Sequence, residues 1–441
     1  MTTTRTTRTA TRTARTAKTV ATAATVRAVN RLTTRWASRA ASDAGGTVFT
    51  AAGVWPLLAL LADGAGGPAR EELTQALGIP AEDAAAAARD LLTALAGVRG
   101  LSVATGLWTK ADLPLKDGWS AQLPPGTRGK LTGDPEGDTK ALDGWASDRT
   151  AGLVERMPVT LQPDTRLVLA SALALTLTWE EPFREFPGRV SDGPWAGRGV
   201  RQLSRTTSGL DPVGVAEGPA GPVTVLRVAG AQDTDLDVHL LLGRPAAPAA
   251  EVLATGVAAA SGTGPLVGGG ALADGSPGPG LTIRAVHAFS PQPQLCVSTV
   301  AFSLSAGHDL LEDAALFGLL TATDGASGHF PGVSTEALAI GSARQSAVAR
   351  FHAAGFEAAA VTAVAARPGG AAPQPHHQAR RAEIRFDRPF GFLAVHRASG
   401  LVLAAGWVTD PEAPAQGRPG AAGPLAPPPL RGVRPPAPPS R

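Results

Sequence analysis

The C-terminal part of the chain places a run of small residues, a long polar loop and an apolar hairpin in direct succession. Residues 355–366, GFEAAAVTAVAA, are mostly small and carry a single Glu, and a segment rich in Pro, Gly and His follows at once. Residues 384–408 predict two strands joined by a turn at 397–400, because apolar residues dominate both arms and Gly marks the turn. An exposed loop held in front of a buried hairpin is therefore expected, and it favours a bait presented to another protein.

The bulk numbers allow a large core and argue against two classes of partner. The chain has 441 residues, of which 44% are hydrophobic and 17% charged, so by length it can form two or three ordinary domains. No uninterrupted apolar run reaches the length of about eighteen residues that a membrane-spanning helix needs. The net charge is only +3, and the body of the chain has no cluster of basic residues. We therefore expect neither a nucleic acid nor a membrane as partner.

The motifs of common enzymes and metal sites are missing from the sequence. The single cysteine, Cys296, excludes an internal disulfide framework, and its apolar, strand-like surroundings predict a buried, inert thiol. No GxSxG, HExxH or CxxC occurs, and the pair His376-His377 has no carboxylate or thiol near it in sequence, so a solvated loop is expected there. A Ser/His/Asp triad would be assembled only by the fold, and nothing in the sequence points to one. We expect no enzyme activity, no cofactor and no metal.

Both ends of the chain are predicted to lie outside the fold. Residues 1–25 consist almost entirely of Thr, Arg and Ala and lack the apolar core of a secretory signal. Such an Arg-rich, acid-free segment also resembles an organellar transit peptide, but a disordered low-complexity extension or a mis-assigned start is the expectation. Residues 412–441 are rich in Pro, Gly and Ala, which predicts disorder or polyproline structure.

Between the ends, the pattern predicts a mixture of helices and strands. Residues 23–41 and 80–95 predict Ala-rich helices, and residues 222–228 and 236–242 predict strands. Residues 262–280 predict a glycine-rich surface loop, because their GGG lacks the strand, Lys and Ser/Thr of a phosphate-binding loop.

Segments spread along the chain resemble, in the same order, the motifs of the serpins, a family of protease inhibitors that act by loop insertion. Besides the loop region itself, the matching segments are TVFTAAGVWPLLALLADGAGGPAREELTQAL (47–77), LSVATGLWTKADLPLKDGW (101–119), LDGWASDRTAGLV (142–154), LVLASALALTLTWEEPF (167–183) and FPGVS (330–334). The resemblance covers residues 26–411. It implies a single α+β domain with three β-sheets, about eight or nine helices and an exposed reactive center loop at about 355–383.

The resemblance implies a serine protease inhibitor rather than an enzyme. In a serpin, a protease cleaves the loop and forms an acyl-enzyme, and the freed segment inserts as a new central strand of a metastable sheet. The implied partner is a serine protease of unknown identity, and we expect the chain to be a monomer. The family points to an extracellular location, whereas the lack of a recognisable signal leaves a cytoplasmic one open.

The hinge of the loop is carried over by position to Gly355, Phe356, Glu357, Ala358, Ala359 and Ala360. An inserting strand turns alternate side chains into the core of the sheet, where small residues avoid overpacking. The inward-facing set would be Phe356, Ala358, Ala360, Thr362 and Val364. Phe356 departs from the usual Thr or Ser, and Ala353 replaces the usual acidic residue. These departures favour an alternative function, a non-inhibitory serpin-fold protein that acts in binding or as a structural component.

The gate through which a strand would enter is carried over to Ser171 and Gln345, which match an Asn and a His of the family. The buried Ser-Pro-x-Ser of the family is replaced by AAGV at residues 51–54, so the polar cluster is either rebuilt with these two residues or lost. Counting forward from Gly355 and counting back from Phe386 give different scissile bonds. The candidates for the scissile region are Ala366, Arg367, Gly369, Gly370 and Arg380.

Overall fold

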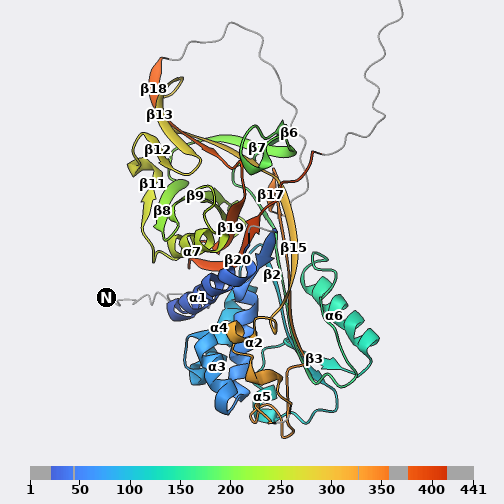
Figure 1. The fold of residues 1–441 in the computed structure, drawn as a ribbon. Coiled ribbons are helices and arrows are strands. Elements are labelled where there is room, and N and C mark those ends of the chain that lie inside the picture. The colour runs from blue at the N-terminus through green and yellow to red at the C-terminus, as the bar shows by residue number, and fades with distance from the viewer. Residues whose placement is uncertain (1–20, 43–44, 326, 357–375, 415–441) are drawn as a thin grey trace, which may run out of the picture.

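Three β-sheets and eight α-helices make up the described part of the computed structural model, which covers residues 21–42, 45–325, 327–356 and 376–414. The predicted α+β class with three sheets is confirmed (Figure 1). The helices are α1 (Ala23–Ala40), α2 (Ala51–Gly64), α3 (Gly67–Leu77), α4 (Ala81–Ala96), α5 (Asp117–Ser120), α6 (Pro135–Arg149), α7 (Ala249–Ala260) and α8 (Ala314–Phe317). Three short 3-10 helices are η1 (Gly193–Trp195), η2 (Gly269–Ala271) and η3 (Thr321–Thr323).

One sheet, here called the long sheet, carries the elements around the predicted loop. Its strands follow the order β3-β2-β4-β16-β17-β5, with β15 also paired to β16. They are β2 (Leu101–Lys110), β3 (Arg128–Leu131), β4 (Leu167–Leu175), β5 (Leu177–Thr178), β15 (Phe302–Asp309), β16 (Ser342–Phe351) and β17 (Gly355–Phe356). All nine residues of β4 are buried, as expected for a strand that is covered on both faces. Figure 1 shows α6 on the face of this sheet opposite to α2 and α4.

The second sheet, here called the hairpin sheet, has the order β1-β20-β19-β10-β9-β8-β11. The predicted hairpin is confirmed as β19 and β20, an antiparallel pair joined at residues 397–400. The strands of the sheet are β1 (Thr47–Phe49), β8 (Val213–Gly218), β9 (Gly221–Ala229), β10 (Leu236–Leu242), β11 (Leu266–Gly268), β19 (Phe390–His396) and β20 (Leu401–Val408). Helices α1 and α7 pack against β20 and β19 and close one side of the core.

The third sheet has six strands in the order β12-β13-β18-β14-β7-β6. They are β6 (Arg184–Arg189), β7 (Gly199–Ser208), β12 (Gly275–Gly278), β13 (Leu281–Ala288), β14 (Gln294–Val300) and β18 (His377–Arg385). Strand β18 lies between β13, with which it runs antiparallel, and β14, with which it runs parallel. The chain that follows the predicted loop therefore forms strand β18 from His377 onward, before the hairpin begins at Phe390.

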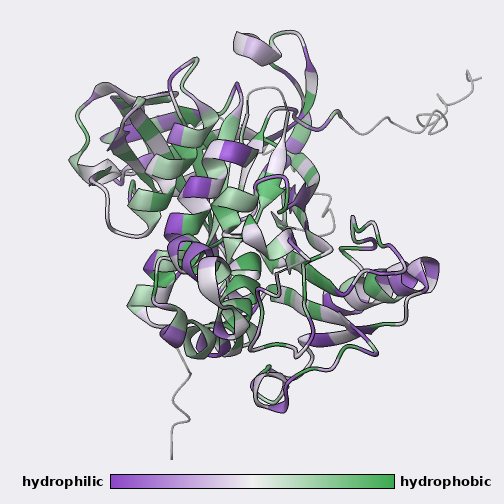
Figure 2. Cartoon of the chain, turned by 60° about the horizontal axis from the view of Figure 1, so that its bottom comes forward, coloured by the Kyte–Doolittle hydropathy of each residue, from purple (hydrophilic) through white to green (hydrophobic). Residues whose placement is uncertain are grey.

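Local sequence signals explain where α2 and α6, on opposite faces of the long sheet, begin. The Thr50 hydroxyl caps α2 by accepting from the Gly53 N–H at 3.2 Å, and Asp134 caps α6, which has Pro135 in its first turn. Helix α2 is apolar on nearly every side and almost wholly buried, so the fold packs around it. Figure 2 shows hydrophobic residues gathered toward the middle of the molecule and hydrophilic ones mostly on the outer helices and loops. Among the described residues, no helix is long and apolar enough to cross a membrane.

Most of the elements predicted from local pattern are confirmed. The helices expected at 23–41 and 80–95 are α1 and α4, and the strands expected at 222–228 and 236–242 are β9 and β10. The glycine-rich segment 262–280 was expected to be a loop, but it contains β11 and β12, because its backbone pairs with β8 and β13. Cys296 was expected to be buried, but it is only partly buried on β14, where alternate side chains turn outward.

Three predicted boundaries also shift. The tail expected at residues 1–25 ends earlier, because Thr22 caps α1 and residues 23–25 are helical. The tail expected from residue 412 begins later, because Glu412 accepts from the Arg201 N–H and donates to the Ala301 carbonyl through its backbone. The loop expected at about 355–383 is narrower, because β17 takes its first two residues and β18 begins at His377.

Candidate functional site

The long sheet already contains the start of the predicted hinge. After β16 the chain turns at residues 352–354, and the His352 N–H donates to the Gly355 carbonyl at 2.9 Å. Strand β17 then pairs antiparallel with β16, where Phe356 lies opposite Phe351, and with β5, where Gly355 lies opposite Thr178. Gly355 and Phe356 are therefore part of the long sheet, between β16 and the continuation of β4. The hinge residues Glu357, Ala358, Ala359 and Ala360 lie outside the described residues.

The turn before the hinge is held by the segment that follows β5. The Trp179 indole Nε1–H donates to the His352 carbonyl at 2.8 Å, and the Trp179 backbone N–H donates to the Ala354 carbonyl at 3.0 Å. The Phe183 N–H donates to the Ala353 carbonyl at 2.8 Å. Three successive carbonyls are thus bound, which fixes the direction in which the chain enters the sheet. Ala353, at the position where the family has an acid, is buried.

The Phe356 ring is fully buried and belongs to an aromatic cluster. Its centroid lies 6.1 Å from that of Phe392 in the hairpin sheet. Phe302 connects the two sheets further, since it stacks on Phe351 at 5.3 Å and lies 5.2 Å from Phe392. The sequence indicated a residue too bulky for the inside of the sheet. The structure accommodates the ring at the junction of two sheets, where its burial contributes about 1.5–3 kcal/mol.

The two predicted gate residues are direct neighbours. Ser171 on β4 lies opposite Gln345 on β16 in a parallel pair of strands, and both are fully buried. The Gln345 amide Nε2 donates to the Thr50 carbonyl at 2.7 Å, and its Oε1 accepts from the Thr50 N–H at 2.8 Å. The Ser171 hydroxyl has no hydrogen-bond partner among the described residues, and it fills the space that Gly53 leaves in the first turn of α2.

The polar cluster is thus partly rebuilt. Residues 51–54, which replace the Ser-Pro-x-Ser of the family, form the first turn of α2 and bring no polar side chain to the gate. The backbone of Thr50 supplies the polar partner instead. Sequence reasoning missed Thr50, Trp179 and Phe183 as functional residues. The latter two stood in a matched motif, but only the tertiary contacts give them a role at the hinge.

Burial lowers the pKa of two titratable side chains near the gate and the hinge turn. His308 on β15 lies opposite Gln345, its Nε2 is 2.9 Å from the Val48 carbonyl, and burial lowers its pKa. The Arg205 guanidinium lies 4.4 Å from the centroid of the Phe183 ring, and burial lowers its pKa to about 10 although Glu181 and Glu180 oppose the shift.

Arg380 was expected in the scissile region, but the structure places it within β18. Its Nε and Nη2 bind the Asp274 carboxylate at 3.0 and 2.9 Å, and its guanidinium also donates to the carbonyls of Gly270 and Leu272. Strand pairing and this ion pair hold it away from any open loop. The other candidates, Ala366, Arg367, Gly369 and Gly370, lie outside the described residues. Within the described part of the chain, no three His, Cys, Asp or Glu side chains are grouped to hold a metal ion.

The family model described as "Serpin (serine protease inhibitor)" matches residues 27–191 and 295–411. The chain belongs to the serpin family. The serpin fold is also found in solved structures: thyroxine-binding globulin in complex with thyroxine has a TM-score of 0.67 at 17% identity, and the match covers 88% of this chain and 99% of that one. The thermophilic serpin tengpin in its native state has a TM-score of 0.67 at 15% identity, with 88% and 93% covered. At these identities the likeness concerns the fold alone.

A relative found by sequence is the putative serpin-Z6A of Oryza sativa subsp. japonica, which is 32% identical over 151 residues. The match covers 31% of this chain and 38% of the rice protein. The aligned part of the chain therefore corresponds to about two fifths of the length of that relative.

Proposed function

We propose that this serpin inhibits a serine protease by cleavage of its reactive loop and insertion of the freed segment as a strand. The observation that carries the proposal is β17, because a loop whose first two residues already lie in the sheet has a defined direction of entry. The segment that follows, AAAVTAVAA at 358–366, is built from small residues that suit an inserted strand. The partner is a serine protease, and its identity is open.

The sheet next to β17 favours such an insertion. Strands β4 and β16 pair in parallel from Val168 with Ser342 to Leu173 with Ala347. A strand that continues β17 between them would run antiparallel to both. Insertion would therefore replace one parallel ladder with two antiparallel ladders, and antiparallel pairing is slightly more stable per residue. The uncleaved form is accordingly metastable, because its loop forgoes these hydrogen bonds.

Phe356 has a different role from the one that its size predicts. Its ring is buried before any cleavage, so its accommodation adds no cost when the rest of the loop enters. It acts as an anchor that keeps the hinge in the sheet. The later inward positions, Ala358, Ala360 and Thr362, would then meet the core with small side chains, and overpacking of about 1–3 kcal/mol per site is avoided.

The gate residues would decide which strands move. Gln345 ties β16 to the start of α2 through both backbone groups of Thr50, whereas the Ser171 hydroxyl of β4 makes no hydrogen bond among the described residues. When the sheet opens, β16 therefore stays with α2. Strand β4 separates together with β2, to which it is paired along nine positions.

We further propose that residues 26–411 are one serpin domain and that the scissile bond lies between Ala366 and Gly370. Proline follows Arg367, which makes the Arg367–Pro368 bond a poor substrate for trypsin-like enzymes. An elastase- or subtilisin-like protease that cleaves after Ala366 is therefore the better target. The alternative function is a non-inhibitory serpin that binds a ligand or partner. The buried Phe356 ring supports this alternative, because a loop whose start is fixed in the sheet is less free to adopt the conformation that a protease binds.

The test is incubation of the full chain with trypsin-, chymotrypsin-, elastase- and subtilisin-like proteases. We expect a protease complex that survives SDS with at least one of them, and a cleaved protein that melts at a markedly higher temperature than the intact one. Phe356→Thr should retain the gain in melting temperature, because the ring is buried before cleavage and adds no cost to the insertion of the later residues. The matched control is Phe289→Thr, because Phe289 is 67% exposed. A cleaved protein that melts no higher than the intact one, in both wild type and Phe356→Thr, would leave the non-inhibitory function.

A further inference from the structure

The small net charge of this serpin conceals an uneven distribution of its charged residues. Residues 1–42 contain nine Lys or Arg residues and no Asp or Glu. Because the whole chain has a net charge of +3, residues 43–441 carry a net charge of −6. The expectation that a membrane is no partner rested on the total charge, and the total does not reveal one strongly basic end.

Helix α1 carries four exposed arginines at intervals of four residues, which places them along one side of the helix. They are Arg27, Arg31, Arg35 and Arg39, here called the arginine stripe. From the first to the last, the stripe extends over about 18 Å at the rise of an α-helix. The other side of α1 is apolar and buried against the core, so the stripe is the side that a partner can reach.

Two neighbouring arginines of the stripe have no acidic partner within the described part of the chain. Arg31 Nη2 donates to the Gly78 carbonyl at 3.0 Å, and Arg35 Nη2 donates to the Ala76 carbonyl. These bonds hold both guanidiniums at the C-terminal end of α3 but leave their charges unneutralised. Partial burial and the charge of Arg31 lower the pKa of Arg35, so an external anion would relieve the repulsion between them.

An open hollow of about 580 Å³ continues the stripe with apolar side chains. Arg35 and Arg39 line it from α1, and Leu311, Leu316 and Leu320 line it from the segment around α8. Leu320 is 59% exposed, which is unusual for a large apolar side chain. Cationic and apolar groups therefore share one surface.

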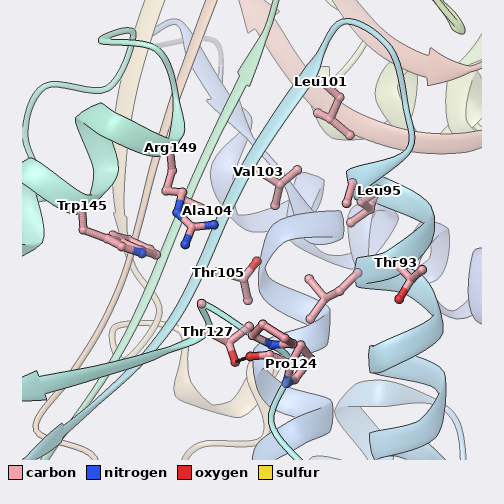
Figure 3. Close-up of a pocket in the computed structure, with 14 residues that line it drawn as sticks. Thr93, Leu95, Leu101, Val103, Ala104, Thr105, Pro124, Thr127, Trp145 and Arg149 are labelled. Atoms are coloured by element: carbon pink, nitrogen blue, oxygen red, sulfur yellow. Dashed lines mark hydrogen bonds between the residues drawn. The ribbon is translucent and has the colours of Figure 1, made fainter.

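The charge of this surface remains positive. Glu312 and Asp313 also line the hollow, and Asp313 accepts from Arg39 Nε at 2.7 Å, so two carboxylates stand against the four guanidiniums of the stripe. The cavity beside β2, which Figure 3 shows, has a single charged residue in its lining, Arg149. Several cations beside an exposed leucine thus distinguish the surface at α1.

We propose that the arginine stripe and Leu320 form a docking surface for an anionic membrane. Each basic side chain that lies near an anionic bilayer strengthens binding by about fivefold, and an exposed leucine beside such charges can enter the boundary between headgroups and acyl chains. A nucleic acid is the less favoured partner, because the chain has no Tyr and Trp36, the aromatic residue of α1, is buried. The stripe therefore offers no ring on which a base could stack.

This docking surface lies away from the end of the molecule that follows the predicted loop. Figure 1 shows α3, whose C-terminal end contacts the stripe, at the lower side and β18 at the top. A serpin seated on a bilayer through α1 would therefore direct β18 away from the lipid. The inference does not depend on whether this serpin inhibits a protease.

Cosedimentation of the full chain with lipid vesicles tests the proposal. Vesicles that contain phosphatidylglycerol should bind the chain at least about tenfold more tightly than vesicles of phosphatidylcholine alone. Most of this difference should disappear in about 0.5 M NaCl, because salt screens exposed charges. Leu320→Ser should weaken binding severalfold, whereas Leu266→Ser, at a 48% exposed leucine of β11, should leave it unchanged.

The charge contribution is tested with paired substitutions. Arg27→Gln together with Arg31→Gln should weaken binding to anionic vesicles by about tenfold or more, and the corresponding Lys variants should retain it. Arg128→Gln together with Arg156→Gln is the matched control, because it removes two exposed charges outside α1.

Three results would each overturn the proposal. The first is equal binding to neutral and anionic vesicles, and the second is equal binding by the Gln and Lys variants of the stripe. The third is displacement of the anionic vesicles by duplex DNA at the same phosphate concentration, which would assign the surface to a nucleic acid.

Discussion

Gln345 binds both backbone groups of Thr50, with its Nε2 on the carbonyl at 2.7 Å and its Oε1 on the N–H at 2.8 Å. These two residues are separated by 295 positions in the chain, and the contact is fully buried. One side chain thus joins the central strand β16 to the first turn of α2. Its neighbour across the strands, Ser171, makes no such contact among the described residues.

The first prediction concerns this contact. Gln345→Leu keeps the approximate volume but leaves the N–H and the carbonyl of Thr50 buried without a partner, which should lower the free energy of unfolding by about 2–4 kcal/mol. Ser171→Ala is the matched control at the neighbouring position. It removes a hydroxyl without a partner and should change the stability by less than about 1 kcal/mol. Denaturant unfolding measures both, and equal losses in the two variants would contradict the assignment of the gate to Gln345.

The second prediction concerns the aromatic cluster. Phe390 is fully buried, and its ring lies 5.1 Å from Phe386, 5.8 Å from Phe302 and 6.1 Å from Trp195. Phe390→Ala should therefore cost about 3–5 kcal/mol of unfolding free energy. Phe289→Ala, at an exposed ring, should cost less than about 0.5 kcal/mol. A loss at Phe390 as small as that at Phe289 would mean that the hairpin contributes little to the core.

The third prediction concerns pH. Burial lowers the pKa of His239 from 6.5 to about 4, with Asp237 opposing the shift and Arg227 adding to it. Between these two pH values the unfolded chain binds a proton that the folded chain does not, so stability should fall as the pH drops from about 6.5 to about 4. The slope is at most about 1.4 kcal/mol per pH unit for one group.

His239→Gln should reduce this slope, whereas His287→Gln, at an exposed position, should leave it unchanged. Part of the slope should remain in His239→Gln, because burial also lowers the pKa of His308. Unfolding curves recorded from pH 7 to pH 4 measure the effect. A slope that is the same in wild type and in His239→Gln would refute the prediction.

The fourth prediction concerns limited proteolysis between residues 45 and 414. An elastase-like enzyme should cut first within residues 358–376, which are rich in Ala. Trypsin should not cut there readily, because Arg367 is followed by Pro and Arg380 lies in β18, bound to Asp274. Arg381 is held in the same strand by Gln294. Mass spectrometry of the fragments identifies the sites, and early tryptic cuts after Arg380 or Arg381 would show that β18 opens easily.

Local sequence pattern was sufficient for several elements of this serpin. The hairpin of β19 and β20 follows from two apolar arms around a turn that ends in Gly400, and α1 and α4 follow from their apolar periodicity. Such elements depend on neighbours in the chain, so their residues carry the signal themselves. The order of short motifs then indicated the family, and with it three sheets and a hinge at Gly355.

Tertiary structure decided what the hinge and gate residues contact. Phe356 is bulky for an inserted strand, and the fold buries its ring beside Phe392 of the hairpin sheet. The sequence placed Arg380 in an open loop. In the structure it lies on β18, which is paired with β13 on one side and with β14 on the other. The contacts of Trp179 with His352 and of Gln345 with Thr50 span 173 and 295 positions. Propensity and periodicity describe near neighbours along the chain, whereas these contacts depend on which strands the completed sheets place side by side.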